Sequence, residues 1–213
     1  MSATVAPTVA ETPAAPRPDA PYRLAVVVAS TREGRFGPVV AAWLGRQLAG
    51  RDDVQVDVID LADHPLSGHL SKEPDAQDTA VLAAVTPRLA AADAFIVVTP
   101  EYNHSYPAPL KNLIDWHYTQ WQAKPVAFVS YGGLSGGLRA VEHLRPVFAE
   151  LHAVTIRETV SFHSPWGRLD TTGLHLDEEA GTAAAGAAKV MLDQLAWWAV
   201  SLREARAARP YGK

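Results

Sequence analysis

Residues 24–49 read LAVVVASTREGRFGPVVAAWLGRQLA, and this stretch decides the fold class. The first six residues are a short Val-rich run, which predicts a strand buried on both faces. A polar loop follows over residues 30–37, and Pro38 suits the first turn of a helix. Apolar residues then recur at helical spacing until Gly50, where the helix is expected to end. The stretch is therefore a strand–loop–helix unit.

The same alternation repeats along the rest of the chain. Further strands are predicted over residues 54–59, 94–99, 126–130 and 154–162, and further helices over residues 78–92, 110–118, 138–151 and 180–208. Pro87 is expected to kink or divide its helix. Buried strands joined by helical crossovers form a parallel sheet with helices on both faces. The sequence thus predicts an α/β fold.

Length and composition narrow the function classes. A chain of 213 residues suits a single α/β domain. The absence of cysteine excludes disulfides, cysteine-ligated metals and a thiol nucleophile. The formal charge is −4, with no block of Lys or Arg and no apolar run of membrane-spanning length. We therefore expect no nucleic-acid partner, no membrane partner and a cytoplasmic location.

The two ends of the chain are expected to lie outside the domain. Residues 1–21 are rich in Ala, Pro and Thr, a composition that buries too little apolar surface to fold, so they are predicted to be a disordered tail. The domain is predicted over residues 22–208, and residues 209–213 form a short C-terminal tail.

Three loops of unusual composition follow the first, third and fourth predicted strands. Ligands of an open parallel sheet bind beyond the carboxyl ends of its strands. The first loop, STREGRFG at residues 30–37, leads into a helix whose first N–H groups favour an anion. Its two hydroxyls and two arginines suit a phosphate monoester. It is neither a Walker A loop nor Gly-x-Gly-x-x-Gly, and the alternative is a solvated loop with surface arginines.

The other two loops can enclose a planar heterocycle. Residues 99–107 read TPEYNHSYP, and their prolines stiffen a backbone that can face the ring edge, while Tyr102 can lie on the ring face. The alternative is a structural turn with Asn103 at a turn position. Residues 130–137 read SYGGLSGG, and their four glycines let the backbone approach a ligand closely. The alternative is a flexible turn.

Together these segments resemble the NADPH-dependent FMN reductase family, a flavodoxin-like group that includes quinone, azo-dye and chromate reductases. The similarity rests on Ser30-Thr31-Arg32 with Arg35, on Pro100-Glu101-Tyr102-Asn103 followed by Leu110-Lys111-Asn112 and Ile114-Asp115-Trp116, and on Ser130-Tyr131-Gly132-Gly133 with Gly136-Gly137. It implies a flavodoxin-like three-layer sandwich with a five-stranded parallel sheet in the order 2-1-3-4-5. It also implies FMN as cofactor, NADPH or NADH as electron donor, and a homodimer or homotetramer.

The resemblance also implies which residues bind the cofactor. The FMN phosphate and ribityl chain are assigned to Ser30, Thr31, Arg32, Arg35, Phe36 and Gly37. The isoalloxazine ring is assigned to Pro100, Glu101, Tyr102 and Asn103, with Tyr131, Gly132 and Gly133 near its other edge. Residues 161–177, with His163, Trp166 and Arg168, belong to none of these motifs and leave the acceptor open.

The implied activity is that of an oxidoreductase whose cofactor performs the chemistry. We hypothesise a ping-pong scheme in which the nicotinamide nucleotide gives a hydride to N5 of FMN and leaves. A small acceptor, such as a quinone, free flavin, azo compound or metal oxyanion, then enters the same space. The scheme requires no protein acid or base, so no catalytic side chain and no metal ligand is expected.

Two other function classes remain open. Residues 133–137 match Gly-x-Ser-x-Gly between a strand and a helix, which makes Ser135 a candidate serine-hydrolase nucleophile. The expected acid and histidine would then be Asp170 and His175, which lie uncomfortably close in sequence. A flavodoxin-like electron carrier or regulator would instead bind the same cofactor with little turnover.

Overall fold

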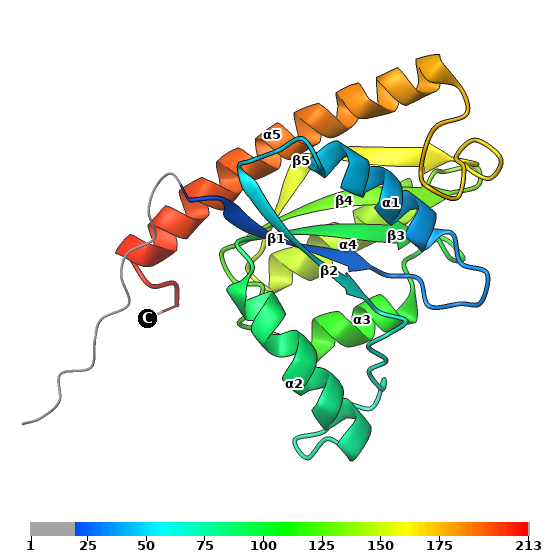
Figure 1. Cartoon of the computed structure of the whole chain (residues 1–213). Coiled ribbons are helices and arrows are strands. Elements are labelled where there is room, and N and C mark those ends of the chain that lie inside the picture. The colour runs from blue at the N-terminus through cyan, green and yellow to red at the C-terminus, as the bar shows by residue number, and fades with distance from the viewer. Residues whose placement is uncertain (1–19, 213) are drawn as a thin grey trace, which may run out of the picture.

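The computed structural model describes residues 20–212, and within them five strands alternate with five helices (Figure 1). In chain order these are β1 (Tyr22–Val28), α1 (Gly37–Leu48), β2 (Val54–Asp60), α2 (Ala76–Ala91), β3 (Ala94–Pro100), α3 (Ala108–Asp115), β4 (Pro125–Gly132), α4 (Leu138–Glu150), β5 (Val154–His163) and α5 (Glu178–Ala208).

All neighbouring strands are parallel, and their order is β2-β1-β3-β4-β5. The predicted flavodoxin-like sheet is therefore confirmed. The chain moves outward from β1 to β2 on one side and returns to β3 on the other, so the topological switch point lies between β1 and β3. All the loops that follow strands lie at the same edge of this sheet.

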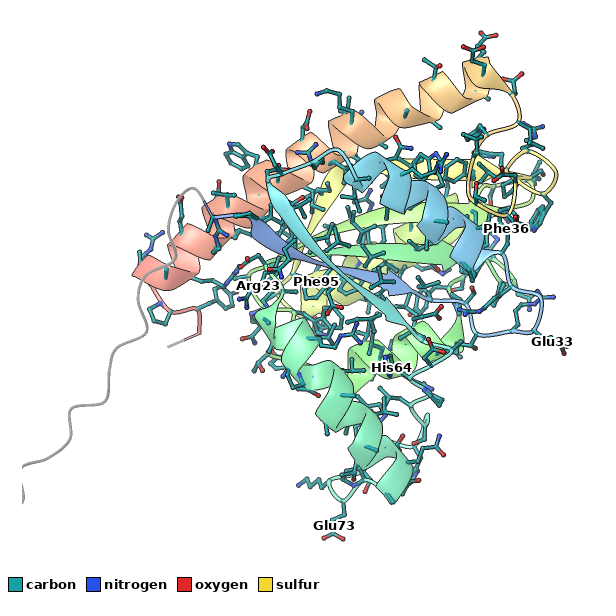
Figure 2. The ribbon with its side chains drawn as sticks, in the orientation of Figure 1. Arg23, Glu33, Phe36, His64, Glu73 and Phe95 are labelled. Atoms are coloured by element: carbon teal, nitrogen blue, oxygen red, sulfur yellow. The ribbon has the colours of Figure 1, made fainter. Side chains whose placement is uncertain are left out.

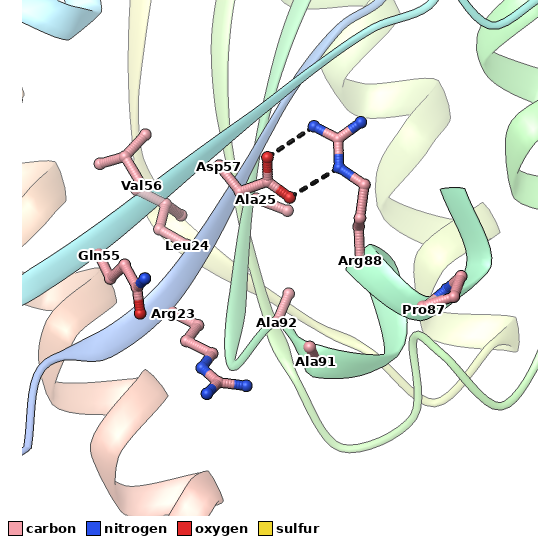
Figure 3. Close-up of a pocket in the computed structure, with 10 residues that line it drawn as sticks. All are labelled: Arg23, Leu24, Ala25, Gln55, Val56, Asp57, Pro87, Arg88, Ala91 and Ala92. Atoms are coloured by element: carbon pink, nitrogen blue, oxygen red, sulfur yellow. Dashed lines mark hydrogen bonds and ion pairs between the residues drawn. The ribbon is translucent and has the colours of Figure 1, made fainter. Parts of the chain in front are cut away.

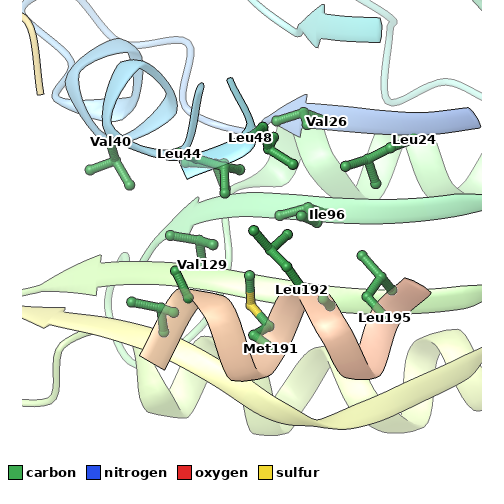
Figure 4. Packing of buried hydrophobic residues seen from close by; sticks show 14 of the residues in the cluster. Leu24, Val26, Val40, Leu44, Leu48, Ile96, Val129, Met191, Leu192 and Leu195 are labelled. Carbon is green, nitrogen blue, oxygen red and sulfur yellow. The ribbon is translucent and has the colours of Figure 1, made fainter. Parts of the chain in front are cut away.

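Helices cover both faces of the sheet, and each face has its own hydrophobic core. On one face, α1 and α5 pack against alternate strand residues such as Val26, Ile96 and Val129, as Figure 4 shows. On the other face, α2, α3 and α4 cover the intervening residues, including Val27 and Phe95. Successive strand residues point to opposite faces, so both cores need the continuous apolar runs seen in the sequence.

Several elements differ from the sequence-based expectation. Helix α3 ends at Asp115, three residues before the predicted end at residue 118, and Trp116 is its C-cap residue. The helix α2 is not divided at Pro87, which lies on its exposed side. Strand β4 extends beyond residue 130 to include Tyr131 and Gly132, because these residues pair with Phe162 and His163 of β5. Tyr131 therefore has the fixed direction of a strand residue and is not part of a glycine-rich turn.

The first strand begins at Tyr22 and the last helix ends at Ala208. The predicted disordered tail over residues 1–21 falls almost wholly outside the described residues. Across the described residues, no helix combines the length and apolarity needed to cross a membrane.

Candidate functional site

A cavity of about 320 Å³ lies at the carboxyl edge of the sheet, where the loops after β1, β3, β4 and β5 meet. Its volume is near the lower end for small-molecule sites. It is lined by Arg32, Gly34, Arg35, Phe36, Pro100, Glu101, Tyr102, Tyr131, Gly132, Gly133 and Trp166. The three motif loops thus converge on one space beside the topological switch point.

The loop after β1 offers backbone donors to an anion. A turn over residues 32–35 is closed by a hydrogen bond from the Arg35 N–H to the Arg32 carbonyl at 3.2 Å, with Gly34 at φ +65°. In residues 20–212, the N–H groups of Thr31, Arg32, Glu33, Gly34 and Phe36 donate to no protein acceptor. Figure 2 shows Glu33 far out on this loop and Phe36 where it enters α1. Free N–H groups at a helix N-terminus are the feature that binds phosphate.

Ser30 and Gly37 support the cavity from below and do not line it. Ser30 is fully buried, and the Tyr131 hydroxyl donates to its Oγ at 3.1 Å. Gly37 lies against the same group, since a Cβ there would be 2.4 Å from Ser30 Oγ. Burial raises the pKa of Tyr131, so its phenol stays protonated. Thr31 is exposed and also does not line the cavity.

The two arginines of this loop differ in their partners. Arg35 forms an ion pair with Asp60 at the end of β2 and donates to the Ser30 carbonyl at 3.0 Å. The hydrogen bond with Asp60 raises the pKa of Arg35. Arg32 is exposed, and no carboxylate among residues 20–212 pairs with it. Its guanidinium carbon lies 5.5 Å from the Tyr102 ring centroid, so Arg32 is the cation available to a ligand.

The loop after β3 is a tight turn. Tyr102 and Ser105 exchange backbone hydrogen bonds of 2.8 and 3.1 Å across Asn103 and His104, which have φ values of 48° and 73°. Two successive left-handed residues identify a type I′ turn, in which asparagine is favoured. Asn103 is therefore exposed at the tip and does not line the cavity. Tyr102 is half-buried, and its burial raises its pKa.

Two of the remaining motif residues, Asn112 on α3 and Trp116 directly after it, anchor a neighbouring loop. Trp116 donates from Nε1 to the Ser67 carbonyl at 2.9 Å, and Asn112 donates to the Leu66 carbonyl at 2.9 Å. Ser67 in turn donates to the Asp78 carboxylate through its N–H at 2.9 Å and its hydroxyl at 2.7 Å. These bonds fix the long loop between β2 and α2 against α3.

Trp166 and Gly34 also line the cavity, although no sequence motif assigns them to it. The ring centroid of Phe36 lies 6.0 Å from that of Tyr131 and 6.1 Å from that of Trp166, so the three aromatic side chains form one wall. Trp166 is 55% exposed. The position of Trp166 after the last strand could have identified it, because the segment that follows this strand lies at the same edge of the parallel sheet as the other ligand-binding loops.

Ser135 does not have the surroundings of a hydrolase nucleophile. Its hydroxyl donates to the Glu101 carboxylate. A serine nucleophile needs a base, usually histidine, within hydrogen-bond reach, and among residues 20–212 no histidine hydrogen-bonds to Ser135. The geometry therefore disfavours the hydrolase interpretation.

A larger cavity of about 420 Å³ lies near the opposite end of the strands (Figure 3). It is bounded by the start of β1, by β2 and by the end of α2, and it contains an ion pair between Arg88 and Asp57 at 2.6 Å. The Arg88 hydrogen bonds lower the pKa of Asp57. Both charges are satisfied by each other, and the cavity lies away from the carboxyl edge where ligands of this topology bind.

Comparisons with known proteins agree with this geometry. The sequence model of the NADPH-dependent FMN reductase family matches residues 22–167. An NAD(P)H-dependent FMN reductase of Schizosaccharomyces pombe is 38% identical over 122 residues, which cover 54% of this chain and 60% of that protein. A 2-hydroxy-1,4-benzoquinone reductase of a Burkholderia species is 32% identical over 165 residues, which cover 74% of this chain and 87% of that protein.

The chain spans 60–66% of the lengths of the first three curated relatives that it matches. Among solved structures, the flavoenzyme FerB, an NAD(P)H:(acceptor) oxidoreductase from Paracoccus denitrificans, is similar with a TM-score of 0.65 and 23% identity. The match covers 82% of this chain and 97% of FerB. At that identity the similarity shows a shared fold.

Proposed function

Because this chain belongs to the NADPH-dependent FMN reductase family, we propose that it binds FMN and passes electrons from NADPH or NADH to a small acceptor. One observation carries the proposal: loops from four different strands line a single cavity, and its lining combines arginine and backbone N–H donors of the loop after β1 with aromatic side chains. FMN has the matching chemistry, a phosphate joined through a ribityl chain to a planar ring.

The donors of the loop after β1 fit the FMN phosphate. The free N–H groups of the lining residues Arg32, Gly34 and Phe36 supply neutral donors, and the exposed guanidinium of Arg32 supplies positive charge. Charge-assisted hydrogen bonds of this kind are stronger than neutral ones. The ion pair between Arg35 and Asp60 fixes the conformation of the loop. Because Gly37 has no side chain, α1 can begin in close contact with Ser30 beneath the loop.

The aromatic residues and the ends of β3 and β4 fit the isoalloxazine ring. Pro100 and Gly132 end adjacent strands, and Tyr102 closes one side of the cavity. A Cβ at Gly132 would lie 3.1 Å from the Gly137 nitrogen, so a side chain here would be tightly packed against the loop after β4. Phe36, Tyr131 and Trp166 form an aromatic wall of the cavity.

Bound FMN would supply the two-electron chemistry, and the protein supplies binding and orientation. No side chain in the cavity is required as an acid or base for this transfer. Tyr131 stays a neutral phenol because burial raises its pKa. The same space serves the nicotinamide nucleotide and then the acceptor, which is the structural premise of a ping-pong scheme.

Steady-state kinetics test this scheme directly. FMN-loaded protein would be assayed with NADPH or NADH at several fixed concentrations of 1,4-benzoquinone, chosen because a relative is named a benzoquinone reductase. Parallel double-reciprocal plots are expected, and intersecting plots would exclude a shared site. Binding of FMN with negligible turnover would favour the electron carrier or regulator instead.

The assembly and location of the protein are also proposals. The family resemblance supports a homodimer or homotetramer, which light scattering coupled to size-exclusion chromatography would distinguish from a monomer. The absence of cysteine is compatible with the cytoplasm, and cell fractionation would test that location.

A further inference from the structure

The loop that follows β4 contains a serine whose role the proposed function leaves unexplained. Ser135 is half-buried, and its hydroxyl donates to Oε2 of Glu101. The loop backbone is tightly held: a Cβ at Gly136 would lie 2.4 Å from Ser161 Oγ, and one at Gly137 would lie 2.7 Å from Ser130 Cβ. Ser135 is therefore presented to Glu101 in a fixed direction.

Arg139, in the first turn of α4, completes the enclosure of the same carboxylate. Its Nε lies 2.9 Å from Oε1 of Glu101, and its backbone N–H donates to Oε2 at 3.2 Å. The guanidinium also contacts His104 Nδ1 at 2.8 Å. The Glu101 side chain is only 9% exposed, whereas that of Arg139 is 40% exposed. Both carboxylate oxygens are thus occupied, and a negative charge is held at the cavity wall.

We propose that Ser135 and Arg139 are positioning residues that fix the Glu101 carboxylate at the cavity wall and compensate its charge, and that they thereby set the affinity and midpoint potential of FMN. The inference rests on the proposed function. Reduced flavin carries more electron density than oxidised flavin, so an uncompensated carboxylate beside it would weaken the hold on the reduced form. The positive charge of Arg139 lies beside the Glu101 carboxylate and offsets its field, so the binding of reduced FMN is not weakened.

A purely structural role is the competing explanation, because the three side chains also tie β3 to α4. If the three side chains only stabilised the fold, removing one of them would lower the melting temperature of the protein without changing the midpoint potential of FMN. A purely structural role would also make Ser161→Ala as harmful as Ser135→Ala, because the Ser161 hydroxyl holds the same loop through the Gly136 carbonyl at 2.8 Å but does not touch Glu101. The two explanations therefore predict different measurements.

The first test is a double-mutant cycle on FMN binding, read from the quenching of flavin fluorescence. Ser135→Ala is expected to weaken FMN binding by up to about tenfold, the limit set by the loss of one hydrogen bond to a charged group. Glu101→Gln keeps the shape but removes the charge, and in that background Ser135→Ala should have a much smaller effect. Ser161→Ala should bind FMN like the wild type. Additive effects, or an unchanged affinity in Ser135→Ala, would overturn the proposal.

The second test is the midpoint potential of bound FMN, measured against a reference dye. Arg139→Met should make it more negative by about 30 mV, the two-electron equivalent of a tenfold weaker hold on the reduced form. Arg139→Lys should restore most of the loss, and Arg139→Met combined with Glu101→Gln should return towards the wild-type value. An unchanged potential in Arg139→Met, with only a lower melting temperature, would contradict the proposal. Wild-type protein that binds no FMN would overturn the proposed function itself, which is a distinguishable result.

Discussion

At Gly37 the backbone passes so close to Ser30 that no side chain can be accommodated. We predict that Gly37→Ala destabilises the protein by about 1–3 kcal/mol, the usual cost of overpacking a tight core. The added Cβ would lie 2.4 Å from Ser30 Oγ and 3.1 Å from the Tyr131 hydroxyl. It should also weaken FMN binding, because the start of α1 has to move. Urea unfolding and an FMN titration measure the two effects.

Gly45 provides a matched control within the same helix. It is exposed, and a Cβ there would meet nothing within 4 Å. Gly45→Ala should therefore raise the free energy of unfolding by about 0.5–1 kcal/mol through helix propensity. If both substitutions had the same effect, the close packing at Gly37 would not be the cause.

Arg32 is predicted to recognise the phosphate of FMN. Arg32→Ala should weaken FMN binding by roughly tenfold, the scale of one charge-assisted hydrogen bond. Riboflavin lacks the phosphate, so its affinity should change little. Arg46→Ala, on the last turn of α1, serves as a control for the loss of one surface charge. An equal loss for FMN and riboflavin would contradict the assignment of Arg32 to the phosphate.

The residue motifs predicted most of the cavity wall, and the exceptions have physical reasons. Ser30 and Gly37 belong to the site but support it from beneath, which depends on side-chain packing that a motif does not encode. Asn103 is at the tip of a type I′ turn, which was the structural alternative for that loop. Trp166 joins the wall through non-local packing on Phe36, and no short-range pattern predicts such a contact.

A buried lysine lies where the C-terminal end of α2 meets the start of β4. Lys124 is 6% exposed, and its ammonium donates to the Leu89 and Ala90 carbonyls at the end of α2, both at 2.9 Å. Burial is the main cause that lowers the pKa of Lys124 to about 8, and the nearby Arg206 lowers it further, while Asp93 opposes the shift. A cation at a helix C-terminus is favourable, but here desolvation has the larger effect.

This pKa predicts a specific pH dependence of stability. Above about pH 8 folded Lys124 is neutral, whereas an unfolded lysine keeps its proton until about pH 10.4. The unfolded chain then binds more protons, so this residue makes the free energy of unfolding rise with pH, by about 2 kcal/mol between pH 8 and 9.5 at most. Below about pH 8 it contributes no slope. The Lys124→Met variant lacks this titration, so its free energy of unfolding, measured by chemical denaturation across this pH range, should not show the rise. The same pH dependence in the variant and in the wild type would contradict the prediction.

The order and type of the elements could be predicted from sequence, but several of their ends could not. Apolar runs identify the strands because both faces of the sheet are covered. The end of β4 depends on its pairing with β5, which is non-local, so Tyr131 and Gly132 were expected in a turn. Pro87 was expected to kink or divide α2, and α2 is not divided there because packing of Val81, Val85 and Leu89 holds one continuous helix on the sheet.

For the whole molecule, the cavity depends on the complete sheet. Its walls come from segments after β1, β3, β4 and β5, which are far apart in sequence and meet only when the strands pair in the observed order. A ligand that needs all four segments therefore binds only the folded protein and stabilises it by mass action.

The central claim is that this cavity binds FMN and lets a nicotinamide nucleotide reduce it. The most direct measurement is an anaerobic absorbance titration of the purified protein, first with FMN and then with NADPH or NADH. We predict that the visible FMN bands shift on binding and bleach rapidly when the preferred nucleotide is added. FMN bands that stay identical to those of the free cofactor at every protein concentration would contradict the account.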